Sequence, residues 1–154
     1  MKTARPLLCW DIFMEGFHKR LELADDIQQL LQLSQQQGWD HSFNFEQQMI
    51  WSNKTILVTD VAFNIVYASS NMFHMNGYLP EEVIGRQPSM FQGKDTSPET
   101  RLHIRNAIEQ RQSCETSILN YRKDGDTYVC HLQEYPVFDR KKALVNFIAF
   151  ECLA

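Results

Sequence analysis

The residues best suited to chemistry are four cysteines and five histidines, and their spacing argues against a metal site. No two cysteines have the separation of a zinc ligand pair, the four being Cys9, Cys114, Cys130 and Cys152. No two histidines lie four residues apart on one helix face, the five being His18, His41, His74, His103 and His131. Structural zinc sites and disulfide frameworks depend on closely patterned ligands. The sequence therefore predicts isolated thiols and no metal site.

A catalytic constellation is also absent from the sequence pattern. No serine or cysteine has a histidine and an acid arranged around it, as nucleophilic catalysis requires. Glu151 and His131 are the only titratable candidates for an internal pocket. We therefore expect a protein that is not an enzyme and has no catalytic residues.

Composition bounds the class of protein. The 154 residues are about one domain's worth, and 44% are hydrophobic, which is too many for a disordered chain. The net charge of −4 offers no basic surface for nucleic acid. No apolar stretch approaches the roughly 20 residues of a membrane span. We expect a cytoplasmic protein that binds neither nucleic acid nor membrane.

The first third of the chain has a helical pattern. Between Pro6 and Gln37, apolar residues recur at three- and four-residue steps and form one stripe, consisting of Trp10, Phe13, Phe17, Ala24, Ile27 and Leu31. Gly16 is a point where this helix could divide, and Gly38 ends it. The stripe must be buried either on the protein's own sheet or against the same helix of a second chain. The heptad-like spacing favours the second chain.

The remaining chain alternates between strand and helix signals. After a linker over 40–53 with one short helical turn, apolar runs predict two strands, over 55–60 and 64–68. Three helices follow, over 70–76 with Ser69 or Ser70 as N-cap, over 79–85, and over 97–110. Three further strands cover 114–121, 126–137 and 144–151. This order predicts an α+β fold, a five-stranded antiparallel sheet with helices on one face and a pocket between the layers.

Several segments, in this order, resemble a PAS domain. They read ILVTD, IVYAS, NGYLPEEVIGR, MFQG, IRNAI, LNYRKDG and YPV, and within the superfamily they are most similar to the LOV (light, oxygen, voltage) flavoprotein branch. The resemblance covers about Thr55 to Glu151. It implies two parts, an N-terminal helical extension with its linker over 1–53 and a sensory domain over 54–154. It also implies a surface ion pair between Glu82 and Lys123.

The segment Gly85–Gln92 differs from the LOV pattern at its reactive position. In LOV proteins the matching segment reads GRNCRFLQ, and its cysteine attacks the photoexcited flavin. This chain reads GRQPSMFQ, with Pro88 in place of that cysteine. Proline has no nucleophile, so the resemblance implies a domain that lacks the adduct-forming cysteine and binds any ligand reversibly.

The other flavin-contacting positions are mixed. Gln92 and Asn120 match LOV residues that bind the polar edge of the flavin, and Arg105 matches an arginine that reaches its phosphate. Gln87 and Glu151 take positions where LOV proteins have Asn and Gln. Phosphate and ring contacts are also lost where Ser89 replaces an arginine and Cys130 replaces an asparagine. We therefore expect an unidentified ligand or an empty pocket rather than flavin mononucleotide (FMN).

These expectations lead to a function. The main hypothesis is a PAS-type signalling module that binds a small ligand or a protein partner without a covalent bond. It would relay the change through its N-terminal helix, as a homodimer, to a separate effector protein or to the rest of a longer chain. The alternative is a non-covalent flavin-binding, LOV-like sensor of light or redox state.

Overall fold

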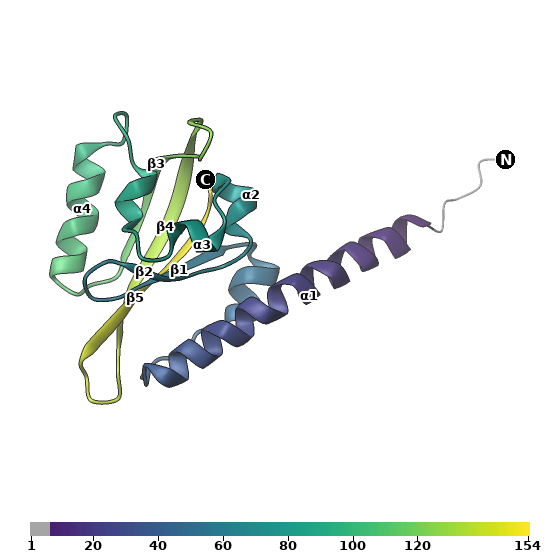
Figure 1. Cartoon of the computed structure of the whole chain (residues 1–154), viewed down its shortest axis with the longest axis horizontal. Helices are drawn as coiled ribbons and strands as arrows, with labels where there is room; N and C mark the ends of the chain where they lie inside the picture. Colours follow the sequence, from purple (N-terminus) through teal and green to yellow (C-terminus); the bar gives the residue numbers. More distant parts are fainter. Residues whose placement is uncertain (1–6) are drawn as a thin grey trace.

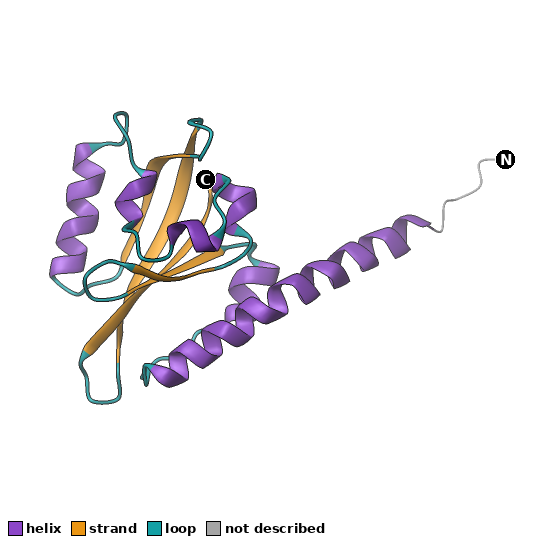
Figure 2. Cartoon of the chain, viewed as in Figure 1, coloured by secondary structure: helices purple, strands orange, loops and turns teal. Residues whose placement is uncertain are grey.

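The computed structural model describes residues 7–154, and its helices and strands alternate as an α+β fold (Figures 1 and 2). In chain order the elements are α1 (Leu7–Gln36), η1 (Gln47–Trp51), β1 (Thr55–Thr59), β2 (Ile65–Ala68), α2 (Met72–Asn76), α3 (Pro80–Val83), η2 (Pro88–Phe91), α4 (Pro98–Glu109), β3 (Cys114–Tyr121), β4 (Thr127–Phe138) and β5 (Leu144–Leu153). The short turn η1 lies within the predicted linker.

The strands form one antiparallel sheet in the order β2-β1-β5-β4-β3. The first and last strands in the sequence thus pair at the centre of the sheet, where Thr55 lies opposite Glu151. On its other side Glu151 lies opposite Leu132 of β4. The predicted α+β class and five-stranded antiparallel sheet are confirmed.

Buried clusters lie on both faces of the sheet, and successive side chains of a strand alternate between them. All five residues of β1 are buried. Leu57 belongs to a cluster on the inner face with α2, α3 and η2, whereas Ile56 and Val58 belong to a cluster on the outer face with the N-terminal segment. The predicted helices lie on the inner face, and the N-terminal extension covers part of the outer one.

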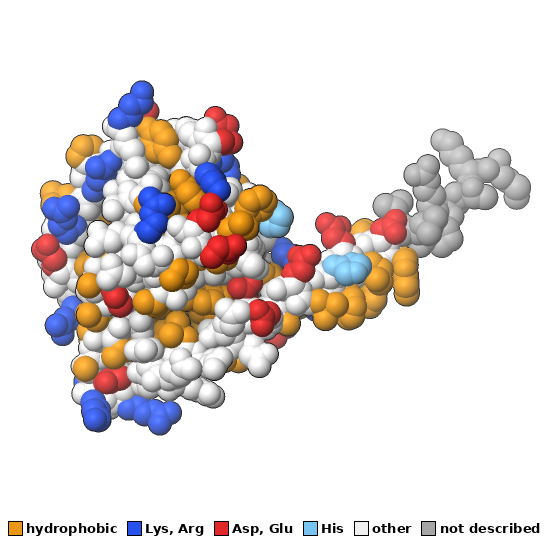
Figure 3. Space-filling model, viewed as in Figure 1, with side chains coloured by type: hydrophobic (Ala, Val, Ile, Leu, Met, Phe, Trp, Pro, Cys, Tyr) orange, Lys and Arg blue, Asp and Glu red, His pale blue; other side chains and the backbone are white. Residues whose placement is uncertain are grey.

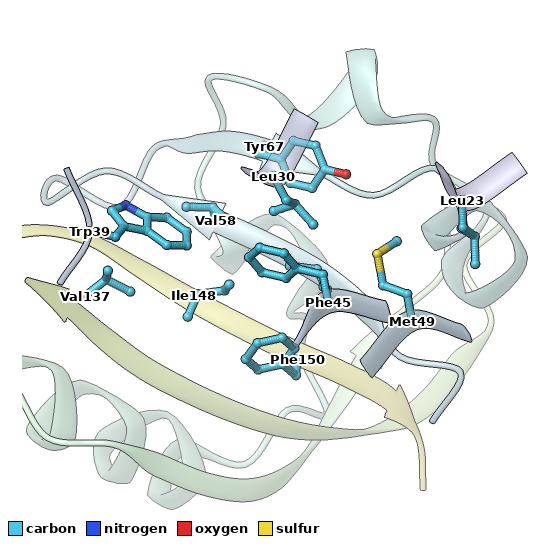
Figure 4. Close-up of a cluster of buried hydrophobic side chains, with 11 residues drawn as sticks. Leu23, Leu30, Trp39, Phe45, Met49, Val58, Tyr67, Val137, Ile148 and Phe150 are labelled. Atoms are coloured by element: carbon cyan, nitrogen blue, oxygen red, sulfur yellow. The ribbon is translucent and has the colours of Figure 1, made fainter. Parts of the chain in front are cut away.

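The outer cluster holds the N-terminal extension against the sheet (Figure 4). Phe45 and Met49, from the region of η1, are buried together with Ile148 and Phe150 of β5. Trp39 closes one end of the cluster, and its indole Nε1 donates to Asn146 Oδ1 at 2.9 Å. Burying side chains of this size stabilises the packed arrangement by about 1.5–3 kcal/mol each.

Local sequence signals explain most helix boundaries. Ser97 caps α4, since its hydroxyl accepts the backbone N–H of Thr100 at 3.3 Å, and Pro98 begins the helix. Gly77 ends α2 with a φ of 80°, a left-handed conformation that glycine adopts without strain. The helix borders predicted from these residues are confirmed.

The predicted cap of α2 is wrong. The N-cap position is Asn71, whose side chain makes no capping bond. The Ser69 hydroxyl instead accepts the backbone N–H of Ile56 at 2.8 Å. The backbone N–H of Ser70 donates to the carboxylate of Asp26, which belongs to α1. The acceptor comes from a distant helix, which a local cap rule cannot foresee.

Helix α1 runs without a break at Gly16 and has two apolar faces. Leu23 and Leu30 are buried in the outer cluster. This part of α1 is therefore buried on the protein's own sheet, which was the first of the two alternatives. Of the stripe predicted from the sequence, Ile27 packs against this cluster as well, whereas the other five residues are exposed on a neighbouring face. Among these five, Trp10, Phe13 and Phe17 are 62%, 61% and 47% exposed, on the half of α1 that projects from the domain (Figure 3). Within residues 7–154, no helix has the length and apolar character needed to cross a membrane.

Candidate functional site

A cavity of about 550 Å³ lies between the inner face of the sheet and the layer formed by η2 and α4. Its volume falls within the roughly 300–1,000 Å³ of small-molecule sites. All five site residues predicted from the sequence line it, namely Gln87, Gln92, Arg105, Asn120 and Glu151. They come from four separate parts of the chain, since Gln87 and Gln92 flank η2 and the others lie on α4, β3 and β5. The fold therefore brings the predicted set together around one space.

Two amides, Gln92 and Asn120, contribute to the polar part of the wall. Gln92 is half-buried just after η2, and Asn120 is 6% exposed near the end of β3. The side-chain oxygen of Asn120 is buried and has no hydrogen-bond partner among residues 7–154. A buried acceptor without a partner costs about 1–3 kcal/mol. This oxygen is therefore available to a hydrogen-bond donor on a ligand.

The segment Pro88–Phe91 forms the 3-10 helix η2, with Pro88 and Ser89 on the cavity wall. None of the described lining residues is a cysteine. Cys130 is fully buried beside the cavity in a cluster with Met75, Ile118 and Tyr128. Burial, reinforced by the Glu151 carboxylate, raises the pKa of the Cys130 thiol, so the reactive thiolate is disfavoured.

Two arginines of α4 border the cavity. Arg105, predicted from the sequence, is exposed at its rim. Arg101 was missed by sequence reasoning. It lies one helical turn earlier and is half-buried, and its Nη2 donates to the backbone oxygen of Gly93 at 2.6 Å. Its Nε is buried and has no hydrogen-bond partner among the residues that the structure describes. The four-residue spacing from Arg105 was the signal that could have identified it.

The inner face of the sheet contributes two buried acids. Glu151 was predicted, and Glu134 was missed. They are 7% and 9% exposed. Glu134 follows Leu132 at a two-residue step on β4, so strand alternation places it on the same inner face. That alternation was the available signal. Burial raises the pKa of each carboxyl to about 7, and Glu134 further raises that of Glu151.

A wider hollow of about 1340 Å³ lies between the N-terminal half of α1 and α2. It contains none of the predicted site residues. Its described lining includes exposed residues such as His18, Phe73 and Leu153. The inner cavity is therefore the candidate site.

The predicted ion pair between Glu82 and Lys123 is present. The hydrogen bond from Lys123 lowers the pKa of the Glu82 carboxyl, with help from the backbone N–H of Leu79. The pair is solvent-accessible, so water screens it and it contributes little to stability. It supports the assignment of the fold and carries no activity.

Gly93, directly after Gln92, leaves no room for a side chain. A Cβ built there would lie within 3.0 Å of three atoms of the Tyr121 ring. We expect Gly93→Ala to lower the free energy of unfolding by about 1–3 kcal/mol, because the ring must move and its hydroxyl bond to Asp95 is disturbed. Urea unfolding measures the loss. Gly16→Ala is the control, with no atom within 4 Å of its Cβ, and should stabilise by about 0.5–1 kcal/mol. An unchanged free energy of unfolding in Gly93→Ala would show that the loop and the Tyr121 ring can move apart at no cost in stability.

The sequence is similar to known proteins over the same region. It matches the PAS domain family over residues 53–151. It is 41% identical over 88 residues to Protein TWIN LOV 1 of Arabidopsis thaliana, covering 56% of this chain and 22% of that protein. It is 38% identical over 87 residues to Phototropin-2 of Oryza sativa subsp. japonica, covering 56% of this chain and 10% of that protein.

Solved structures share the fold. A light-oxygen-voltage domain studied with a flavin analogue superposes with a TM-score of 0.67 at 27% identity, covering 73% of this chain and 86% of that one. The light-state LOV domain of the blue-light photoreceptor Aureochrome1 superposes with a TM-score of 0.62 at 30% identity, covering 65% of this chain and 80% of that one.

The matched segment is a small part of the curated relatives, 22% of the first and 10% of the second. The similarity therefore concerns one domain of those proteins. The family match spans more than half of the chain, over all five strands. The chain belongs to the PAS domain family.

Proposed function

We propose that this chain is a LOV-like sensor of light or redox state that holds a flavin without a covalent bond. The relatives named for light sensing support this alternative better than a sensor for an unrelated ligand. The observation that carries the proposal is the buried Asn120 oxygen, which lines the cavity together with Gln92 and has no hydrogen-bond partner in the described part of the chain. A flavin ring has an imide N–H that such an acceptor could bind.

The residues present fit a flavin. Gln92 and Asn120 would hold the polar edge of the ring, and apolar side chains of the sheet, such as Leu132 and Phe147, would contact its face. Arg101 and Arg105 would attract a phosphate tail at the rim. When bound, the flavin supplies blue-light absorption and reversible electron uptake. The protein's part is to orient it and to exclude water.

We propose that the binding is reversible because the chain lacks the adduct-forming cysteine. Pro88 stands at that position and has no nucleophilic atom. The nearby Cys130 thiol is packed among apolar side chains and has a raised pKa. A signal would therefore depend on changed hydrogen bonding or charge in the cavity. We propose no catalytic activity for this module.

Strand β5 offers the route from the cavity to the N-terminal extension. Glu151 points into the cavity, and its neighbour Phe150 points to the outer face. The ring of Phe150 lies 5.5 Å from that of Phe43, just before η1. A shift of β5 would thus reach the residues that hold α1. We propose that α1 passes the change to a second copy of the chain or to a separate effector.

The exposed stripe of α1 supports a homodimer. Trp10, Phe17, Ala24 and Leu31 recur every seven residues, the repeat of paired helices. The rings of Phe13 and Phe17 stack at 6.4 Å and, with Trp10, form an apolar surface on the projecting helix. An apolar surface of this kind marks an interface. A second copy presents the same stripe, so the two are self-complementary.

Replacing the stripe should dissociate this dimer. We expect Phe13→Ala together with Phe17→Ala to weaken the dimer by roughly 100-fold or more, since each buried phenyl ring contributes about 1.5–3 kcal/mol. Sedimentation of the purified protein measures the change. Ile12→Ala is the matched control, because Ile12 is 65% exposed but lies on a different face of α1. A monomeric wild type, or an equal effect of both variants, would contradict the interface.

The flavin assignment is tested on the purified protein. We expect the absorption bands of an oxidised flavin and release of the intact molecule on denaturation, identified by mass spectrometry. Colourless protein that takes up neither FMN nor riboflavin would overturn the proposal. A cysteine-linked flavin after illumination would overturn its non-covalent part.

Pro88→Cys provides a matched variant. A thiol placed at the position of the LOV cysteine should give a light-driven loss of flavin absorption that recovers in the dark. The wild-type protein should not show that cycle. If Pro88→Cys binds flavin but never forms the adduct, the alignment of Pro88 with the reactive position is wrong.

A further inference from the structure

Glu134 and Glu151 are diagonal neighbours on the inner face of the sheet. Glu151 of β5 lies opposite Leu132 of β4, and Glu134 lies two residues after Leu132 on β4. Diagonal neighbours of this kind are about 7–8 Å apart, within reach of two long side chains. Both carboxyl groups line the candidate cavity and are more than nine-tenths buried.

No described cation neutralises this pair. Within residues 7–154 neither carboxyl forms an ion pair, and Glu134 Oε2 has no hydrogen-bond partner. The ionisable groups around them are Cys114 on β3, Tyr128 and Cys130 on β4, and Arg101, Arg105 and Glu109 on α4. Two unpaired carboxylates at this depth would be costly. The neutral form is therefore favoured in the cavity.

A neutral carboxyl and a carboxylate recognise opposite partners. A protonated carboxyl donates one hydrogen bond, whereas a carboxylate only accepts. The polar edge of an oxidised flavin carries two carbonyl oxygens and unprotonated ring nitrogens, so it has more acceptors than donors. Ionised carboxyls facing these acceptors would repel the ring, whereas protonated ones would bind it.

We propose, on the basis of the flavin function above, that Glu134 and Glu151 bind the ring in their protonated form and thereby couple ligand uptake to proton uptake. The two residues set the specificity of the cavity for a neutral, acceptor-rich ring. The unpartnered Asn120 oxygen accepts the ring's N–H, so the wall presents both donor and acceptor groups. The pKa of each carboxyl, raised to about 7 by burial, places this coupling near neutral pH.

The test is a titration of the ligand-free protein with riboflavin, which has no phosphate group to ionise in this range. We expect the dissociation constant to rise above about pH 7, by up to tenfold per pH unit for each linked proton. Quenching of riboflavin fluorescence reports the affinity. Calorimetry in buffers of different ionisation enthalpy counts protons, and about one should be taken up near pH 7.

The isosteric variants Glu134→Gln and Glu151→Gln should each flatten the pH dependence, and the double variant should remove it. Glu99→Gln, an exposed acid in the first turn of α4, should keep the wild-type profile. Circular dichroism checks that the variants are folded. Riboflavin binding of equal affinity at about pH 6 and pH 8.5, or tighter at the higher pH, would overturn the coupling and leave the flavin proposal standing. Failure to bind riboflavin or FMN at any pH would overturn both.

Discussion

Asp26→Ala is expected to lower the free energy of unfolding by roughly 2–5 kcal/mol and to loosen α1 from the domain. Asp26 is 6% exposed, and its Oδ1 accepts the hydroxyl of Tyr67 at 2.6 Å. Its carboxylate also accepts the backbone N–H and the hydroxyl of Ser70. Alanine removes these acceptors and leaves the buried Tyr67 hydroxyl with no partner of comparable strength.

The neighbouring residue gives a matched control. Asp25 is exposed, and its carboxylate accepts the Gln29 side chain at 2.6 Å within the same helix. Asp25→Ala should therefore change stability by no more than about 0.5 kcal/mol. Urea unfolding measures both variants, and hydrogen exchange of α1 amides should rise only in Asp26→Ala. Equal losses for the two variants would show that the bonds to Tyr67 and Ser70 contribute little.

A double-mutant cycle isolates the bond between Asp26 and Tyr67. Burial and the nearby Asp26 carboxylate raise the pKa of the Tyr67 hydroxyl, so it stays protonated and can donate to Asp26. Tyr67→Phe should destabilise the wild-type protein more than it destabilises Asp26→Ala, since the hydroxyl has already lost its acceptor there. A coupling energy near zero would contradict a direct link between α1 and β2.

The sequence predicted most of the elements because their signals are local. Strand alternation, Pro98 after Ser97 and the left-handed Gly77 depend on residues a few positions apart. Asp26 was not predicted, because its partners lie 41 and 44 residues away. Helical periodicity identifies an apolar stripe but does not show which face of α1 the sheet covers. That choice depends on tertiary packing.

The candidate site was also predicted in part. Five residues assigned by resemblance line one cavity, although their role in binding stays a prediction. Glu134 and Arg101 were missed because resemblance directs attention to positions where the family has a known contact. An acid on the inner face of a strand breaks the apolar pattern, and such a break is expected at functional sites.

The buried acids should also make stability depend on pH. The ordinary carboxyl pKa of 4.5 is raised to about 7 in both Glu134 and Glu151, so the folded protein binds more protons than the unfolded chain between these values. The contribution of these two acids to stability is then fully present below about pH 4.5 and is lost as the pH rises to about 7. The loss amounts to roughly 3 kcal/mol for each carboxyl.

Replacing either acid with glutamine should remove this loss. We expect Glu134→Gln or Glu151→Gln to gain roughly 2–3 kcal/mol over the wild type on going from about pH 5 to pH 8, measured by urea unfolding. The difference between the two pH values is the test, because the new amide changes stability equally at both. Glu46→Gln, an exposed acid before η1, should show no such difference. A gain in the free energy of unfolding that is the same at both pH values would contradict the proposal that Glu134 and Glu151 are protonated in the folded protein.

The double variant distinguishes one coupled pair from two independent acids. Part of the raised pKa of Glu151 comes from its repulsion by Glu134, so Glu134→Gln alone should lower the pKa of Glu151. The pH-dependent gain of the double variant should therefore be smaller than the sum of the two single gains. Strict additivity would mean that the two carboxyls do not interact. Protonation of one would then leave the other unchanged, and ligand binding would take up its protons in two unlinked steps.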